Sequence, residues 1–154
     1  MDDEKFMLRA IKRALQAEKA GNLPVGALIT LNNEIIAEGE NMIWTPTQDG
    51  TRHAEMQAIR AVPKRLWVSA AEMSIYTTLE PCLMCFGSIL LHKIGRVVFG
   101  VADDYGGASP VLPYLPPFFK EQAGKLQWLG PLMPDKCDPL RERLRSLEES
   151  RKFF

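Results

Sequence analysis

MSIYTTLEPCLMCFGSILLHKIGRVVFGV, residues 73–101, is the stretch that decides the fold. Its first part, 73–79, is short, apolar and rich in β-forming residues, and it predicts a strand. Glu80 precedes a proline and is therefore biased towards extended backbone, whereas Pro81 suits the first position of a helix, which we expect over 82–92. This turn lies at the carboxyl end of a strand, where open α/β sheets place their ligands.

The elements on either side of this unit alternate between helix and strand. We expect a helix over 3–20, a hairpin of 23–31 and 34–38, a buried helix over 53–62, a strand over 96–101, a loop over 106–117, a short helix over 118–123, a strand over 126–129 and a charged helix over 137–150. This alternation predicts an α/β fold with a mixed sheet covered by helices on both faces.

The composition predicts one domain over residues 1–154, because this length suits a single hydrophobic core. Lys and Arg balance Asp and Glu at 19 each, and the pI of about 6.7 is well below the roughly 9 of a dedicated nucleic-acid-binding domain. No apolar run reaches the roughly 18 residues of a membrane span, and the first residues are acidic where a secretion signal is basic. With three cysteines, two of them three positions apart, we expect a cytoplasmic protein with a metal or redox site.

Two short motifs carry the chemistry: His53-Ala54-Glu55 and Pro81-Cys82-Leu83-Met84-Cys85. Cys82 and Cys85 are three apart at a helix start, so they share one face, and the helix N-terminus favours their thiolates. His53, at the start of another helix, supplies a third ligand. Three protein ligands leave the fourth position of zinc for water, as in catalytic sites, so we expect one zinc ion per chain.

Glu55 is the predicted catalytic residue. It lies two positions from His53, close to the metal but not required as a ligand. A carboxylate there can take a proton from the attacking water and deliver protons to the ring nitrogen and the leaving amine.

Other interpretations of these residues remain open. A lone CxxC pair is also found in redox sites, although a redox pair is expected after the first strand of its unit. A structural zinc site would need a fourth ligand, for which Cys137 and His92 are the candidates. A non-catalytic, zinc-stabilised subunit is a further alternative, but it would have no use for Glu55 beside the metal.

The order H-x-E followed by P-C-x-x-C is the signature of zinc deaminases, and here the chain resembles the cytidine deaminase-like superfamily. Within it, the likeness is greatest to bacterial tRNA adenosine deaminases, over roughly residues 23–101. Free guanine deaminases and fungal-type cytosine deaminases look similar over the same stretch. The stretches that match are Pro24-Val25-Gly26-Ala27, Gly39-Glu40-Asn41, His53-Ala54-Glu55, Thr78-Leu79-Glu80-Pro81-Cys82-Leu83-Met84-Cys85 and Ile94-Gly95-Arg96-Val97-Val98-Phe99-Gly100.

The resemblance implies a three-layer α/β/α sandwich with a five-stranded mixed sheet, usually in a homodimer or larger assembly. It implies a hydrolytic deaminase that replaces an amino group on a nucleobase by a carbonyl and releases ammonia. It also implies that Asn41 hydrogen-bonds the substrate, that the Ala27 main chain lines the base pocket, and that the Glu80 carbonyl accepts from the attacked amino group.

The substrate is the open question, between adenosine in tRNA, slightly favoured by the motifs, and a free base or nucleoside. Where tRNA enzymes typically carry an arginine and a lysine, this chain has Ala102 and Tyr105. Two sets of residues bear on the choice. Candidate phosphate contacts are Arg52, Lys93, Arg141, Arg143, Arg145, Arg151 and Lys152, and candidate borders or lids of a closed pocket are Trp44, Tyr105, Tyr114, Phe118, Phe119, the 110–119 loop and Phe153-Phe154.

Overall fold

The computed structural model describes residues 2–151. The elements in chain order are α1 (Asp3–Lys19), β1 (Gly26–Leu31), β2 (Glu34–Glu40), α2 (Ala54–Ala61), the 3₁₀ segment η1 (Lys64–Glu72), β3 (Ser74–Leu79), α3 (Leu83–Leu91), β4 (Arg96–Val101), the 3₁₀ segment η2 (Ser109–Tyr114), α4 (Pro117–Ala123), β5 (Gln127–Leu129) and α5 (Pro134–Ser150). Among these residues, no helix is both long and apolar enough to cross a membrane.

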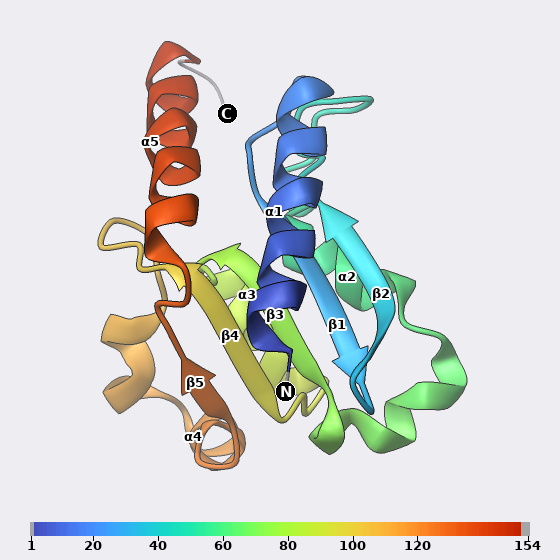
Figure 1. Ribbon diagram of the computed structural model, residues 1–154. Coiled ribbons are helices and arrows are strands. Elements are labelled where there is room, and N and C mark those ends of the chain that lie inside the picture. The colour runs from blue at the N-terminus through green and yellow to red at the C-terminus, as the bar shows by residue number, and fades with distance from the viewer. Residues whose placement is uncertain (1, 152–154) are drawn as a thin grey trace.

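One five-stranded mixed sheet forms the middle layer, in the order β2-β1-β3-β4-β5. β1 pairs antiparallel with β2 and β3, whereas β3, β4 and β5 run parallel. Helices α1 and α5 cover one face of the sheet, with α2 and α3 on the other (Figure 1). The expected three-layer sandwich with a five-stranded mixed sheet is therefore confirmed.

The register of the central strands separates the core into two layers. Leu28, Tyr76 and Val98 lie side by side on β1, β3 and β4, and they pack beneath α1 and α5. Their neighbours Ile29, Ile75 and Val97 point to the opposite face, towards α2 and α3. Because both faces are covered, the central strands are buried almost throughout.

Three local expectations were wrong. The strand expected over 23–31 begins only at Gly26, because Pro24 has no N–H to donate to a ladder. The 106–117 loop contains η2, since a 3₁₀ turn tolerates prolines near its start. The last helix begins at Pro134 rather than at 137, because a proline at the first helical position gives up no intrahelical bond. The helix then continues through Pro139 at the cost of one N–H donor.

Candidate active site

The start of α2 carries His53 and Glu55 to the carboxyl ends of β3 and β4. His53 is the extended N-cap residue of this helix, and Glu55 lies in its buried first turn. The helix packs directly on β2 at Gly39, where an added Cβ would come 2.3 Å from the Ala54 carbonyl oxygen. Only glycine permits this approach, so Gly39 helps to fix both functional side chains.

The start of α3 carries the two cysteines. Cys82 is the extended N-cap residue of α3, its carbonyl accepts the Phe86 N–H at 2.9 Å, and Cys85 lies in the first turn. Cys85 is buried and Cys82 is partly exposed to the cavity. The two thiols therefore meet on one face of the helix start, as their spacing predicts.

The His53, Cys82 and Cys85 ligand atoms come together within 4.8 Å of one another. The His53 Nδ1 atom lies 3.5 Å from the Cys82 Sγ and 3.6 Å from the Cys85 Sγ. Zinc bonds of about 2.3 Å to sulfur and about 2.0 Å to nitrogen, at a tetrahedral angle, separate two such ligand atoms by about 3.5 Å. The arrangement therefore has the dimensions and the donor types of a zinc site with three protein ligands.

The electrostatics of the group suit a cation. Hydrogen bonds from the Cys85 thiol and the His53 ring outweigh burial and lower the pKa of Cys82 to about 4. Its thiolate is thus available at neutral pH, which is the form that binds metals. Beside it, burial raises the pKa of Glu55, whose side chain is only 4% exposed. A carboxylate with a raised pKa is matched to accepting and returning a proton near neutral pH.

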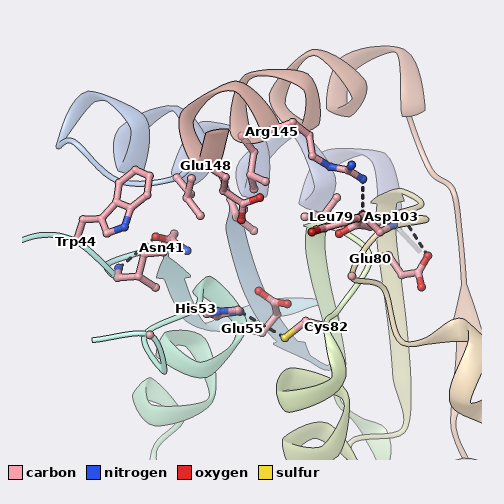
Figure 2. A pocket seen from close by; sticks show the side chains of 17 residues that line it. Asn41, Trp44, His53, Glu55, Leu79, Glu80, Cys82, Asp103, Arg145 and Glu148 are labelled. Carbon is pink, nitrogen blue, oxygen red and sulfur yellow. Dashed lines mark hydrogen bonds and ion pairs between the residues drawn. The ribbon is translucent and has the colours of Figure 1, made fainter. Parts of the chain in front are cut away.

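A cavity of about 370 Å³ opens above these residues. Its floor is formed by His53, Glu55 and Cys82, as Figure 2 shows. The volume lies within the range of small-molecule sites, which is about 300–1,000 Å³.

The first 101 residues match the family model of the cytidine and deoxycytidylate deaminase zinc-binding region. The chain belongs to this deaminase family. The tRNA-specific adenosine deaminase of Bacillus subtilis (strain 168) is 43% identical over 111 residues, which cover 71% of this chain and 68% of the relative. The corresponding Aquifex aeolicus (strain VF5) protein is 38% identical over 117 residues, covering 75% of this chain and 77% of the relative.

Solved structures agree with this fold. A chain from studies of A-to-I editing by tRNA:A34 deaminases superposes with a TM-score of 0.74 at 27% identity, covering 89% of this deaminase and 99% of that chain. The guanine deaminase from Nitrosomonas europaea shares the fold, with a TM-score of 0.70 at 18% identity over 91% of this deaminase and 83% of that chain.

One side wall of the deaminase cavity holds Asn41. Its N–H donates to the Val25 carbonyl at 3.0 Å, and its Oδ1 accepts the Ile43 N–H at 3.2 Å. The first bond holds the main chain and the second orients the side chain, and the Nδ2 group has no hydrogen-bond partner within residues 2–151. Trp44 lines the same wall, whereas Ala27 is fully buried in β1 and is not among the lining residues.

Glu80 lines the opposite wall, but its carboxylate is already used. It accepts the Asp103 N–H at 3.2 Å and the Ser109 N–H and hydroxyl at 3.0 and 2.8 Å. An added Cβ at Gly107 would come 2.2 Å from this carboxylate, so glycine is required there. Glu80 thus anchors the loop after β4 through its carboxylate. The role that the resemblance implies for Glu80, accepting a hydrogen bond from the attacked amino group, concerns its main-chain carbonyl.

The candidate fourth ligands lie elsewhere. Cys137 is buried between α5 and the sheet, in the core layer that contains Tyr76 and Val98. His92 ends α3, where its Nδ1 donates to the Ser88 carbonyl at 2.7 Å and its ring packs on Trp67. Among residues 2–151, therefore, only His53, Cys82 and Cys85 form a cluster able to hold a metal.

Helix α5 forms the roof of the cavity. The sequence predicted the helix but not its position over the cavity. Arg145 and Glu148 extend from this helix over the cavity (Figure 2), and Leu144 also lines it. The 110–119 loop, expected as a lid, instead packs against α3 through Leu115 and Phe119. The alternative lid, Phe153-Phe154, and the candidate phosphate contact Lys152 lie outside the described residues. The only sequence signal for the roof was the helical spacing of 144, 145 and 148, which is typical of any charged helix.

The α5 arginines proposed as phosphate contacts are held by acidic residues. Four ion pairs account for them: Arg141 with Asp138, Arg143 with Glu18 at 2.7 Å, and Arg145 with Asp103 at 2.8 Å and with Asp104 at 3.2 Å. The Arg151 guanidinium lies 3.9 Å from the centre of the Trp44 ring. Of the five aromatic residues expected near the site, Trp44 and Tyr105 line the cavity.

Proposed function

We propose that the chain is a zinc-dependent hydrolytic deaminase that acts on adenosine in tRNA, replacing the 6-amino group by a carbonyl and releasing ammonia. The observation that carries the chemistry is the buried Glu55 carboxylate at the floor of a cavity that His53 and Cys82 also line, with the Cys85 thiol grouped with theirs. The names of the two bacterial relatives, both tRNA-specific adenosine deaminases, support the substrate.

His53, Cys82 and Cys85 would hold one zinc ion per chain. When bound, zinc lowers the pKa of a coordinated water towards roughly 7 and so supplies a nucleophile at neutral pH. The chain contributes two thiol ligands at a helix N-terminus, which favours their anionic form, and one imidazole that binds through Nδ1.

Glu55 would move the protons. Its carboxylate would take one proton of the attacking water and pass it to the ring nitrogen of the base. It would then take the second proton, from the hydroxyl group of the addition product, and deliver it to the departing amine as the carbonyl forms and the C–N bond breaks. Burial raises its pKa, which suits a group that both accepts and donates protons near neutral pH. Asn41 would orient the base through its Nδ2 group, and the Glu80 carbonyl would accept from the reacting amino group.

A free base or nucleoside is the second candidate substrate. The specific observation in its favour is the charge around the cavity mouth, where Arg145 is neutralised by Asp103 and Asp104 and the Glu148 carboxylate adds a negative charge. Ala102 and Tyr105 add no cation there. Phosphates of a nucleic acid would meet few uncompensated positive charges at this rim.

Ammonia release tests the proposal. The purified protein is incubated with a tRNA pool, adenosine, adenine, guanine, cytosine and cytidine, and inosine in tRNA is scored by sequencing. We expect ammonia and inosine from tRNA. Efficient turnover of a free base or nucleoside with tRNA untouched would select the second candidate, and no ammonia from any substrate would refute deamination.

We also propose that residues 1–154 are a single cytoplasmic deaminase domain that forms a homodimer or larger homo-oligomer. Support for assembly comes from an apolar groove along α3, lined by Leu83, Phe86, Leu90 and Phe119, together with the exposed side chain of Leu91. Light scattering of the purified chain tests the assembly, and a monomer at micromolar concentration would contradict it.

A further inference from the structure

Glu148 is a carboxylate in the cavity that the proposed chemistry does not use. It projects from the face of α5 towards the space above Glu55 and His53, on the side of the cavity opposite to them (Figure 2). Glu55 alone suffices for the proton transfers, and its position beside His53 leaves Glu148 at the other end of any bound base. A role for Glu148 must therefore concern the far end of the substrate.

The Glu148 carboxylate has no partner in the part of the chain that the structure describes. No hydrogen bond or ion pair within residues 2–151 involves it, although Arg145 lies one helical turn away. The Arg145 guanidinium is instead directed to Asp103 and Asp104. Burial raises the pKa of Glu148 against the opposing charge of Arg145, and the negative charge of Asp103 adds a smaller rise.

Glu148 and its neighbour Glu149 are both exposed, but only Glu148 lines the cavity. A molecule that fills the cavity would displace water from the Glu148 carboxylate. A carboxylate that loses water without gaining a donor is costly, so the bound molecule has to supply one. Glu148 thus has the placement of a recognition group for a ligand in the cavity.

We propose that Glu148 is a specificity-determining residue that accepts a hydrogen bond from an O–H or N–H at the end of the substrate opposite the reacting amino group. This inference rests on the proposed deamination, which places the amino group beside Glu55. In a nucleoside or a nucleotide of RNA the donor is a ribose hydroxyl, and in a free base it is a ring N–H. The ribose hydroxyl and the ring N–H are both uncharged hydrogen-bond donors, so the Glu148 carboxylate can accept from either.

Steady-state kinetics on the zinc-loaded protein test the role, with Glu149→Ala as the matched control. For the substrate that the wild type prefers, Glu148→Ala raises KM about 10–100-fold, the value of a hydrogen bond to a charged group, and changes kcat by less than about threefold. Glu148→Gln, which keeps an acceptor oxygen, has a smaller effect. Glu149→Ala leaves KM unchanged.

Modified substrates separate the two sources of the donor. If a ribose hydroxyl is the donor, 2′-deoxyadenosine or RNA with a 2′-deoxy target loses affinity with the wild type but not with Glu148→Ala. If a ring N–H is the donor, 9-methyladenine shows the same non-additive loss. A KM for Glu148→Ala equal to that of Glu149→Ala would overturn the proposal.

Binding gives a readout that does not need turnover. Adenosine, inosine and adenine are titrated calorimetrically into the wild type, Glu148→Ala and Glu149→Ala. If the wild type deaminates nothing, the proposed function fails, whereas a tenfold weaker binding to Glu148→Ala alone still supports the role of Glu148. Equal binding to all three proteins, or no binding to the wild type, overturns it.

Discussion

At the residue scale, the metal group depends on two N-cap positions. His53 and Cys82 both have extended backbone immediately before a helix, so both side chains project from the helix starts towards the same point. Cys85 joins them from the first turn of α3, and Glu55 from the first turn of α2. Short local spacings determine the positions within each motif, which is why the sequence predicted the two halves of the group, and the fold brings the two helix starts together.

Removal of the thiols tests the metal ligands. The purified protein is expected to carry about one zinc per chain, and the Cys82→Ala, Cys85→Ala double variant is expected to carry almost none, because one imidazole cannot hold the ion. Elemental analysis measures both. Cys137→Ala is the matched control and keeps its zinc, since this thiol lies in the core away from the group. Full zinc in the double variant would refute the assignment.

Removal of the Glu55 carboxylate tests the proton carrier. Glu55→Gln keeps the size of the side chain but cannot accept a proton, so turnover is expected to fall about 10²–10⁴-fold or more. Ammonia release measures the turnover, and zinc content and melting temperature show that metal and fold are retained. Near-normal turnover in a folded, zinc-loaded variant would mean that another group moves the protons.

At the element scale, the order of the helices and strands and the packing of the last helix differ in how far the sequence predicts them. The order of strands and helices was predictable because hydrophobic periodicity is local. The position of α5 over the cavity was not, since it depends on packing between distant segments. An added Cβ at Gly100 would come 2.2 Å from the Cys137 Sγ, so this contact brings α5 close to β4. The cavity roof, with Glu148, follows from that contact and from the ion pair between Arg143 and Glu18.

The first turn of α1 is attached to the sheet by a charged contact with a defined pH dependence. Asp3 lies 2.6 Å from an Arg96 guanidinium nitrogen and accepts the Tyr76 hydroxyl at 2.6 Å. The Arg96 hydrogen bond lowers the pKa of Asp3 below 3.8. A lowered folded-state pKa means that the stabilisation is complete above the unfolded pKa and is lost as the pH falls through the folded value.

Asp3→Asn is therefore expected to lower the free energy of unfolding by about 1 kcal/mol at pH 7, a value reduced for partial exposure. The difference from the wild type is expected to shrink as the pH falls below the unfolded-state pKa of an aspartate, about 3.9, and through the lower folded-state value. Urea unfolding at pH 7 and over a descending series of acidic pH values measures it. Glu4→Gln, in the same helical turn but with no contact to Arg96, is the control. A difference of constant size across the series would contradict the electrostatic origin.

At the scale of the whole molecule, the balance of positive and negative charge bears on the choice between tRNA and a small substrate. The chain carries 19 basic and 19 acidic residues, and the structure pairs its α5 arginines with acids on α1, on α5 itself and on the loop after β4. The sequence showed these arginines as candidate phosphate contacts on one charged helix, because ion-pair partners distant in the chain cannot be seen in a pattern of residues. A polyanion would therefore find fewer uncompensated charges than the helix alone suggests.

Salt dependence measures how many phosphates the deaminase neutralises. If tRNA is the substrate, log affinity falls with log salt by about 0.7–0.9 per phosphate contact. The cation expected to make such a contact is Arg151, which lies on the Trp44 ring beside the cavity. Arg151→Gln is then expected to weaken tRNA binding and to reduce the slope by about one. Arg52→Gln is expected to have a smaller effect, because Asp49 lies 3.5 Å from the Arg52 guanidinium. Arg143→Gln is the control with a smaller effect, because Glu18 already balances that charge.

Adenosine carries no phosphate, so its turnover should respond to neither salt nor these variants. Salt-insensitive turnover of adenosine or a free base, together with no action on tRNA, would establish the small substrate instead.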